Sequence, residues 1–298
     1  MIPETSRIPL LGLLWIAAVV LVGAAVIGAA AALVGGFIFL VVVFPIFMGA
    51  AGGWMLAWAI RKGKVRSALT AVLAAVLMGV LMYGIYNAGD FLRFRRDVTE
   101  AITMEYGPQD QADIDLFIEM VLEDETGLGG FPGYLLLNAK DGVTLSRTYG
   151  SDGIVLSGVW YWLLFAVELG LIIYFAAQAA VKQARQPFCA VCDRWYSASQ
   201  ILGFAAVEKE ADLLAGVEQH SYHPMAGALQ GDAALPRVAV LAQTCGQCLA
   251  SPARLILRRQ SLNYKKQLVQ KDIKVVDVDP LQFNDLVRRL ETTENLDA

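Results

Sequence analysis

Long apolar runs dominate the first part of the chain. The run from Ile8 to Ile60 carries no charged side chain and is long enough for two membrane crossings, since one crossing needs about 20 apolar residues. We expect Gly35-Gly36 to form the turn between these crossings. Two further runs extend from about Ser67 to Ala88 and from about Ile154 to Val181. The pattern predicts four transmembrane helices, at about residues 8–33, 37–60, 67–88 and 154–181.

Composition agrees with a membrane protein. Hydrophobic residues make up 56% of the 298 residues and the mean hydropathy is +0.51, which excludes a pair of ordinary soluble domains. The first apolar segment runs directly into the second, so we expect it to be retained rather than removed as a signal peptide. The chain shows no basic stripe of the kind that nucleic-acid binding needs, so no nucleic-acid partner is expected.

Two features of the apolar runs predict how the helices are placed. The spacing Gly49-x3-Gly53 allows the backbone of another helix to approach closely. Three aromatic residues near the start of the fourth crossing are typical of a membrane–water interface: Trp160, Tyr161 and Trp162.

Basic residues predict the orientation. Clusters of Lys and Arg in short linkers mark the cytoplasmic side. Such a cluster follows the second apolar run: Arg61, Lys62, Lys64 and Arg66. Both termini are then expected to be cytoplasmic, with residues 90–153 outside. A second basic cluster opposes this orientation, but acidic residues flank it and its loop is long, where the rule weakens: Arg93, Arg95 and Arg96.

Residues 90–153 are expected to form a small acidic α+β domain, with thirteen Asp or Glu against five Lys or Arg. YLLLNAKDGVTLSR predicts a hairpin that turns at Lys140-Asp141-Gly142. The acidic residues 123–125 lack the spacing of a calcium loop, so a solvated helix end is favoured over a cation site. Helical spacing of five apolar residues, with Gly127 as the expected stop, predicts one amphipathic helix: Ile114, Phe117, Ile118, Val121 and Leu122.

The tail, residues 182–298, is expected to be a small α+β domain in the cytosol. The segment from Glu208 to His220 predicts a short helix. Three segments of the tail predict strands: VAVLAQ, ARLILRR and QLVQKDIKVVDVD. A helix opened by Asp279-Pro280 is predicted over LQFNDLVRRL.

All four cysteines of the chain lie in two Cys-x2-Cys pairs of this tail. Structural disulfides are rare in the cytosol, whereas two tight turns with two thiolates each supply the tetrahedral ligand set that structural Zn²⁺ prefers. We therefore predict a zinc-ribbon-like domain in which 52 residues separate the second cysteine from the third. The tightest zinc turns favour a small residue directly after the second cysteine of a pair, because that residue takes a positive φ. Asp193 is tolerable at this position, whereas Leu249 is not ideal. The predicted ligands are Cys189, Cys192, Cys245 and Cys248.

Other interpretations of the tail stay open. CGQC after an apolar strand is also the pattern of a thioredoxin-like dithiol between a strand and a helix. An iron–sulfur site or free thiols are further alternatives. His220 and His223 could supplement a thiolate, but four cysteines already complete a ligand set, so we favour loop positions for both histidines.

Glu168 is the one charged residue inside the fourth apolar run. An unpaired carboxylate in the membrane is costly, so this side chain must be neutral, paired or hydrated. Hydrogen bonds to Tyr83 or Asn87 are available compensations. We favour a structural bond to a neighbouring helix or a second copy over a proton- or ligand-linked role.

Two segments of the chain carry a resemblance to a known group of proteins. They are GKVRSAL, after the second crossing, and WYWLLFAVELGLIIYFAAQAAVKQARQPFCAVCDRW, which runs into the first cysteine pair. They are similar to a group of uncharacterised bacterial four-pass inner-membrane proteins with a Cys-x2-Cys cytosolic tail. The resemblance covers the membrane core better than the soluble parts. It implies a bacterial inner membrane and this topology, and it carries over no activity.

The chain lacks a nucleophile–base pair, a phosphate-binding loop and an HExxH motif, which favours a non-enzymatic function. We hypothesise a membrane module that anchors a zinc-stabilised interaction domain with a scaffold, assembly or sensing role. Its expected partners are the lipid bilayer and a protein or a second copy of the chain. The alternatives are a small transporter or proton-coupled carrier that uses Glu168, and a cytosolic dithiol oxidoreductase.

Overall fold

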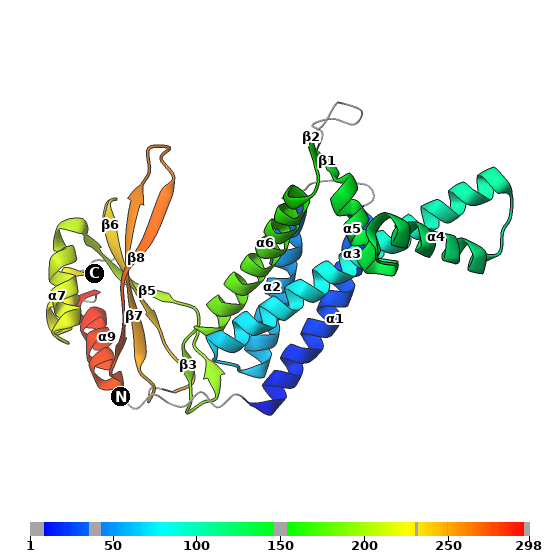
Figure 1. Cartoon of the computed structure of the whole chain (residues 1–298). Coiled ribbons are helices and arrows are strands. Elements are labelled where there is room, and N and C mark those ends of the chain that lie inside the picture. The colour runs from blue at the N-terminus through cyan, green and yellow to red at the C-terminus, as the bar shows by residue number, and fades with distance from the viewer. Residues whose placement is uncertain (1–8, 36–42, 146–153, 230–231, 249, 295–298) are drawn as a thin grey trace. The chain divides into compact units, whose positions relative to one another are not determined.

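The computed structural model describes residues 9–35, 43–145, 154–229, 232–248 and 250–294. The chain divides into two compact units, Met1–Arg185 and Gln186–Ala298. The first unit is mostly helical, and the second is built on an antiparallel sheet, as Figure 1 shows. The turn expected at Gly35-Gly36 extends outside the described residues, because residues 36–42 are not among them.

Four helices of the first unit are long and apolar enough to cross a membrane. The predicted set of apolar helices is therefore confirmed, although two of its boundaries are wrong. The fourth crossing was predicted from residue 154, but Gly158, with φ +59°, precedes the helix and Ile154–Leu156 forms a strand. The four helices are α1 (Leu10–Gly35), α2 (Val43–Gly63), α3 (Ala68–Tyr106) and α6 (Val159–Ala184).

Helix α3 is much longer than the predicted segment that ends near residue 88. Its 39 residues span about 58 Å, against about 30 Å for the hydrocarbon core of a bilayer. The part beyond the apolar segment is stabilised by packing against other helices through four apolar side chains: Phe91, Phe94, Val98 and Ile102.

Small residues let the long helices pack closely. A Cβ atom at Gly49 of α2 would lie 2.6 Å from the carbonyl oxygen of Ile172 in α6, and one at Gly53 would lie 2.9 Å from Cα of Ala176. The close approach predicted from the Gly49-x3-Gly53 spacing is therefore confirmed, with α6 as the neighbour. Large apolar side chains such as Leu73 and Leu163 remain exposed on the outside of the bundle, where lipid would cover them.

Two short helices, α4 (Gln111–Thr126) and α5 (Gly130–Asp141), pack against the extension of α3. Asp110 caps the start of α4, and Gly127, with φ +78°, ends it as predicted. The face of α4 that contains Ile114, Ile118 and Leu122 is buried. Two of the five apolar residues assigned to this helix lie instead on its exposed side: Phe117 and Val121.

The hairpin predicted at Lys140-Asp141-Gly142 is wrong. Residues 130–141 form helix α5, and strand β1 (Val143–Leu145) pairs with β2 (Ile154–Leu156) instead. The ring of Tyr134 in α5 lies 5.3 Å from that of Phe91 and 5.1 Å from that of Phe94, so packing on α3 holds this segment as a helix. The part expected to be α+β is mostly helical, with only this short ribbon among its described residues.

The second unit contains a four-stranded antiparallel sheet in the order β5-β6-β7-β8. Helices α7 and α9 lie on one face of it, as Figure 1 shows, and α7, α8 and α9 contribute to the core on the sheet. The strands predicted for β6, β7 and β8 and the helices predicted for α7 and α9 are confirmed, whereas β5 was not predicted. The elements are β5 (Gln200–Ala206), α7 (Glu210–Glu218), α8 (His223–Ala228), β6 (Arg237–Gln243), β7 (Ala253–Leu262), β8 (Leu268–Val278) and α9 (Pro280–Glu294).

Candidate functional site

The first cysteine pair lies in a tight turn between two short strands. Strand β3 (Phe188–Cys189) pairs with β4 (Arg194–Trp195), and the backbone N–H of Cys192 donates to Sγ of Cys189 at 3.3 Å. Asp193 follows with φ +52°, the left-handed conformation that was predicted to be tolerable for an Asp at this position. The turn thereby directs both sulfur atoms to the same place.

The second cysteine pair lies in the connection between β6 and β7. The backbone N–H groups of Gln247 and Cys248 lower the pKa of the Cys245 thiol, Gln247 the more strongly. Sγ of Cys248 lies 3.7 Å from the hydroxyl oxygen of Ser251. Leu249, whose fit to the turn was in question, is outside the described residues.

The two turns bring all four sulfur atoms together, within 4.8 Å of one another. Sγ of Cys189 and Sγ of Cys248 are 3.6 Å apart, far beyond the length of a disulfide, which is about 2.05 Å. Four sulfur atoms bound to one Zn²⁺ at about 2.3 Å would lie about 3.8 Å apart at the corners of a tetrahedron. The predicted ligands therefore form a cluster that could hold one metal ion.

Burial differs between the two members of each pair. Cys189 and Cys245 are 1% and 6% exposed, whereas Cys192 and Cys248 are half-buried. The first member of each pair belongs to the packed base of the site, and the second closes it toward the surface. Four donors of this kind leave no open position for a substrate, which is typical of a structural metal site.

Hydrogen bonds among the sulfur atoms shift their pKa values in opposite directions. The thiol of Cys192 donates to Cys248, which lowers the pKa of Cys248 to about 6 and raises the pKa of Cys192 to about 12. Backbone N–H groups, first that of Gln247, lower the pKa of the Cys245 thiol. The site thus favours a thiolate at neutral pH, and a bound cation would displace the proton of Cys192.

Contacts that the sequence did not reveal hold the two turns together. The backbone N–H and the side-chain hydroxyl of Ser197 both donate to the carbonyl oxygen of Thr244, at 3.0 and 2.9 Å. The hydroxyl of Tyr196 donates to the carbonyl oxygen of Pro252 at 2.6 Å. A Tyr-Ser pair directly after strand β4 is too common a pattern to predict these bonds.

The placement expected for a redox dithiol is not found. CGQC lies in the connection between antiparallel strands β6 and β7, rather than between a strand and a helix. His220 is not part of the sulfur cluster; its Nδ1 lies 3.4 Å from the hydroxyl oxygen of Tyr222. The side chain of His223 is outside the described part of the structure.

Glu168 lies on α6 of the first unit and is hydrogen-bonded there. The hydroxyl of Tyr83 in α3 donates to Oε2 of Glu168 at 2.6 Å, as predicted. Asn87, the other expected partner, instead donates to the backbone carbonyl of Tyr83 at 2.7 Å. The carboxyl group therefore has a partner within the same chain.

The basic cluster that opposed the predicted orientation has structural roles. Arg93 donates to the carbonyl oxygen of Ala32 in the last turns of α1 and pairs with Asp90 at 3.2 Å. A guanidinium at a helix C-terminus is favourable, because the last carbonyl groups of a helix lack partners. Arg95 pairs with Asp115 of α4.

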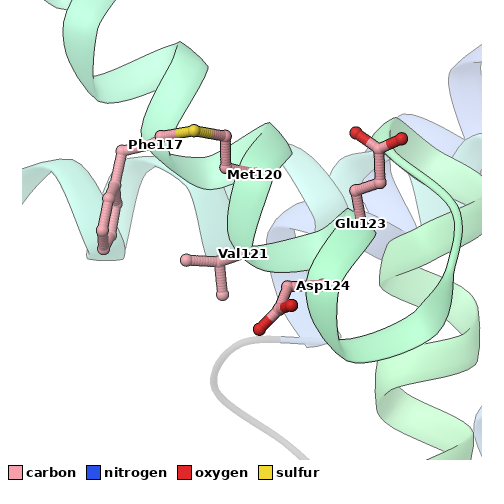
Figure 2. A pocket seen from close by; sticks show the side chains of 5 residues that line it. All are labelled: Phe117, Met120, Val121, Glu123 and Asp124. Carbon is pink, nitrogen blue, oxygen red and sulfur yellow. The ribbon is translucent and has the colours of Figure 1, made fainter.

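The acidic residues 123–125 do not converge. Figure 2 shows the carboxyl groups of Glu123 and Asp124 pointing in different directions at the edge of a shallow pocket. Glu125 pairs with Lys140. The floor of the pocket is apolar and is formed by three residues of α4: Phe117, Met120 and Val121.

Comparisons of the chain with protein-family models, with curated proteins and with solved structures found no match.

Proposed function

We propose that this protein is a non-enzymatic membrane module in which four helices anchor a zinc-stabilised, zinc-ribbon-like interaction domain. The observation that carries the proposal is the cluster of four sulfur atoms within 4.8 Å, built from two separate turns. A scaffold, assembly or sensing role suits such a site, since four thiolates leave Zn²⁺ no position for substrate.

The metal would act on folding. When bound, Zn²⁺ would join the turn between β3 and β4 to the connection between β6 and β7, and its binding free energy would become folding free energy. The chain's own residues prepare this link, because Ser197 and Tyr196 already tie the two segments together. The β5–β8 sheet would then offer a fixed surface to a protein partner or to a second copy of the chain.

The proposed location is a bacterial inner membrane with both termini in the cytoplasm. The basic cluster from Arg61 to Arg66 supports this orientation. The roles of Arg93 and Arg95 support it further, because helix capping and ion pairing account for these two charges at the opposite end of α3. A reduced cytosol would also keep the four thiols available for metal.

Labelling of one introduced cysteine tests the orientation. Glu123 is exposed on α4, so a membrane-impermeant thiol reagent should label Glu123→Cys in intact cells. Labelling that needs permeabilised cells would invert the topology and weaken the zinc assignment with it.

Metal analysis tests the function directly. We expect the purified full chain to contain one zinc per chain, and to capture a protein partner or a second copy by cross-linking. The variant Cys245→Ser should lose both metal and capture, whereas Ala190→Ser, an exposed change in the same turn region, should keep both. A folded chain with well under one zinc would refute the proposal.

The other two hypotheses make different predictions. A dithiol oxidoreductase would change its thiol content during a redox cycle, which thiol trapping would detect. A carrier would depend on titration of Glu168, which the substitution Glu168→Gln removes without changing the size of the side chain.

A further inference from the structure

The hairpin formed by β7 and β8 extends past the rest of the sheet. Pairing between β6 and β7 ends at Arg237 with Gln260, while β7 and β8 continue to pair as far as Leu262 with Leu268. The projecting end is visible in orange in Figure 1. We call residues 261–271 the hairpin tip.

Large apolar side chains of the hairpin tip are exposed. Tyr264 is 89% exposed, which is the largest fraction among the exposed large hydrophobic residues of the described structure. Leu262 and Leu268 form a cross-strand pair and therefore share one face of the hairpin. Val269 is exposed as well. Exposed apolar groups gathered at a projecting tip indicate a contact surface.

The turn at the hairpin tip has a defined conformation. Oδ1 of Asn263 accepts hydrogen bonds from the backbone N–H groups of Lys265 and Gln267, both at 2.9 Å. Lys266 takes the left-handed conformation, with φ +57°. Tyr264, Lys265 and Lys266 are thus held outward on a preorganised turn.

The hairpin tip carries uncompensated positive charge. No acidic residue occurs between Asp232 and Asp272. Within the described structure, three exposed lysines of the tip form no salt bridge with any carboxylate: Lys265, Lys266 and Lys271. The arginines lower on the same hairpin differ, since Arg254 pairs with Asp277 and Arg258 pairs with Asp272.

We propose that the hairpin tip docks on the anionic lipid surface of the membrane that anchors the chain. The negative surface potential of an anionic bilayer attracts nearby lysines, while tyrosine and leucine side chains enter the interfacial region. Covalent attachment favours this partner, because β3 begins only four residues after the end of α6 and the tail therefore stays close to a bilayer.

The proposal depends on the membrane crossing of α6, and it does not depend on the identity of the metal.

Hydrogen–deuterium exchange on the full chain in nanodiscs tests the docking. We expect amides of residues 262–268 to exchange several-fold more slowly when phosphatidylglycerol replaces part of the phosphatidylcholine. High salt should remove this difference, since the attraction is screened. Exchange in β6 reports separately whether the tail is folded, so loss of the metal site would be recognised there.

Two matched variants complete the experiment. Lys265→Gln with Lys266→Gln should abolish the lipid dependence, while Arg254→Gln with Arg258→Gln, which removes the same charge from the same hairpin, should keep it. Equal exchange in both lipids, or equal loss in both variants, would overturn the proposal. The amides of the hairpin tip could instead exchange more slowly in phosphatidylcholine discs only after a single-stranded oligonucleotide is added. That result would overturn the proposal and identify nucleic acid as the ligand of the tip.

Discussion

The hydroxyl of Tyr83 donates a 2.6 Å hydrogen bond to Glu168 and thereby joins α3 to α6. Tyr83 is only 5% exposed, and its ring packs edge-on against that of Phe165, with 4.6 Å between the ring centroids. A carboxyl group in a membrane helix needs such a partner, because a polar group without one is costly in hydrocarbon. The bond explains how the fourth apolar helix accommodates an acidic residue.

Substitution of Glu168 should separate a structural from a titrating role. Glu168→Gln keeps an acceptor for Tyr83, so we expect the helices to assemble as in the parent. Glu168→Leu leaves the Tyr83 hydroxyl without its partner and should cost about 1–3 kcal/mol of stability, measured by unfolding in mixed micelles. The exposed change Val167→Leu serves as the control.

Functional assays of the Glu168 variants show whether this residue has a role beyond assembly. If Glu168→Gln assembles normally and also functions normally, the role is structural. Proton flux into liposomes that the parent supports and Glu168→Gln loses would favour the carrier hypothesis. Unchanged stability and function in Glu168→Leu would contradict both roles.

Gly49→Ala should disrupt the contact between α2 and α6. Its Cβ would lie 2.6 Å from the backbone oxygen of Ile172, and a backbone atom cannot move aside as a flexible side chain can. Gly170→Ala in α6 is the control, because a Cβ there meets no atom within 4 Å. Cross-linking between α2 and α6 should fall in the first variant only; an equal effect in both would contradict the packing.

Replacement of any one of the four cysteines by serine should lower the metal content well below one ion per chain. Each supplies one of four donor atoms, and a serine hydroxyl is a poor ligand for a metal that prefers thiolate. Elemental analysis and thermal unfolding of the tail measure the two effects. Retention of the metal in all four variants would show that the ion binds elsewhere.

Acid should release the metal. The pKa of Cys248 is lowered to about 6, so its thiolate persists at neutral pH and takes up a proton as the pH falls through that value. Any contribution of this thiolate to stability is fully present above the ordinary thiol pKa. It is lost as the pH falls through the lowered pKa of about 6. We expect metal content to be constant from pH 8 to about 7 and to fall only at or below about pH 6. Release that begins above neutral pH would contradict this arrangement of thiols.

The sequence by itself determined the features that depend on local pattern. The length of an apolar run sets whether a helix can cross a membrane, and two Cys-x2-Cys turns bring thiolates into pairs whatever surrounds them. The left-handed conformation of Asp193 and the stop at Gly127 followed from the same local chemistry. Strands β6, β7 and β8 were likewise predicted from the residues along the chain.

Tertiary structure decided the features that depend on distant residues. Residues 134–137 could be strand or helix by their pattern, and packing of the Tyr134 ring against Phe91 and Phe94 selected the helix. Strand β5 was missed because its pairing with β6 is interrupted by a bulge near Gly203 and involves a partner far along the chain. The choice of Tyr83 over Asn87 as the partner of Glu168 joins residues 85 positions apart, and only the packing of α3 against α6 brings that hydroxyl to the carboxyl group.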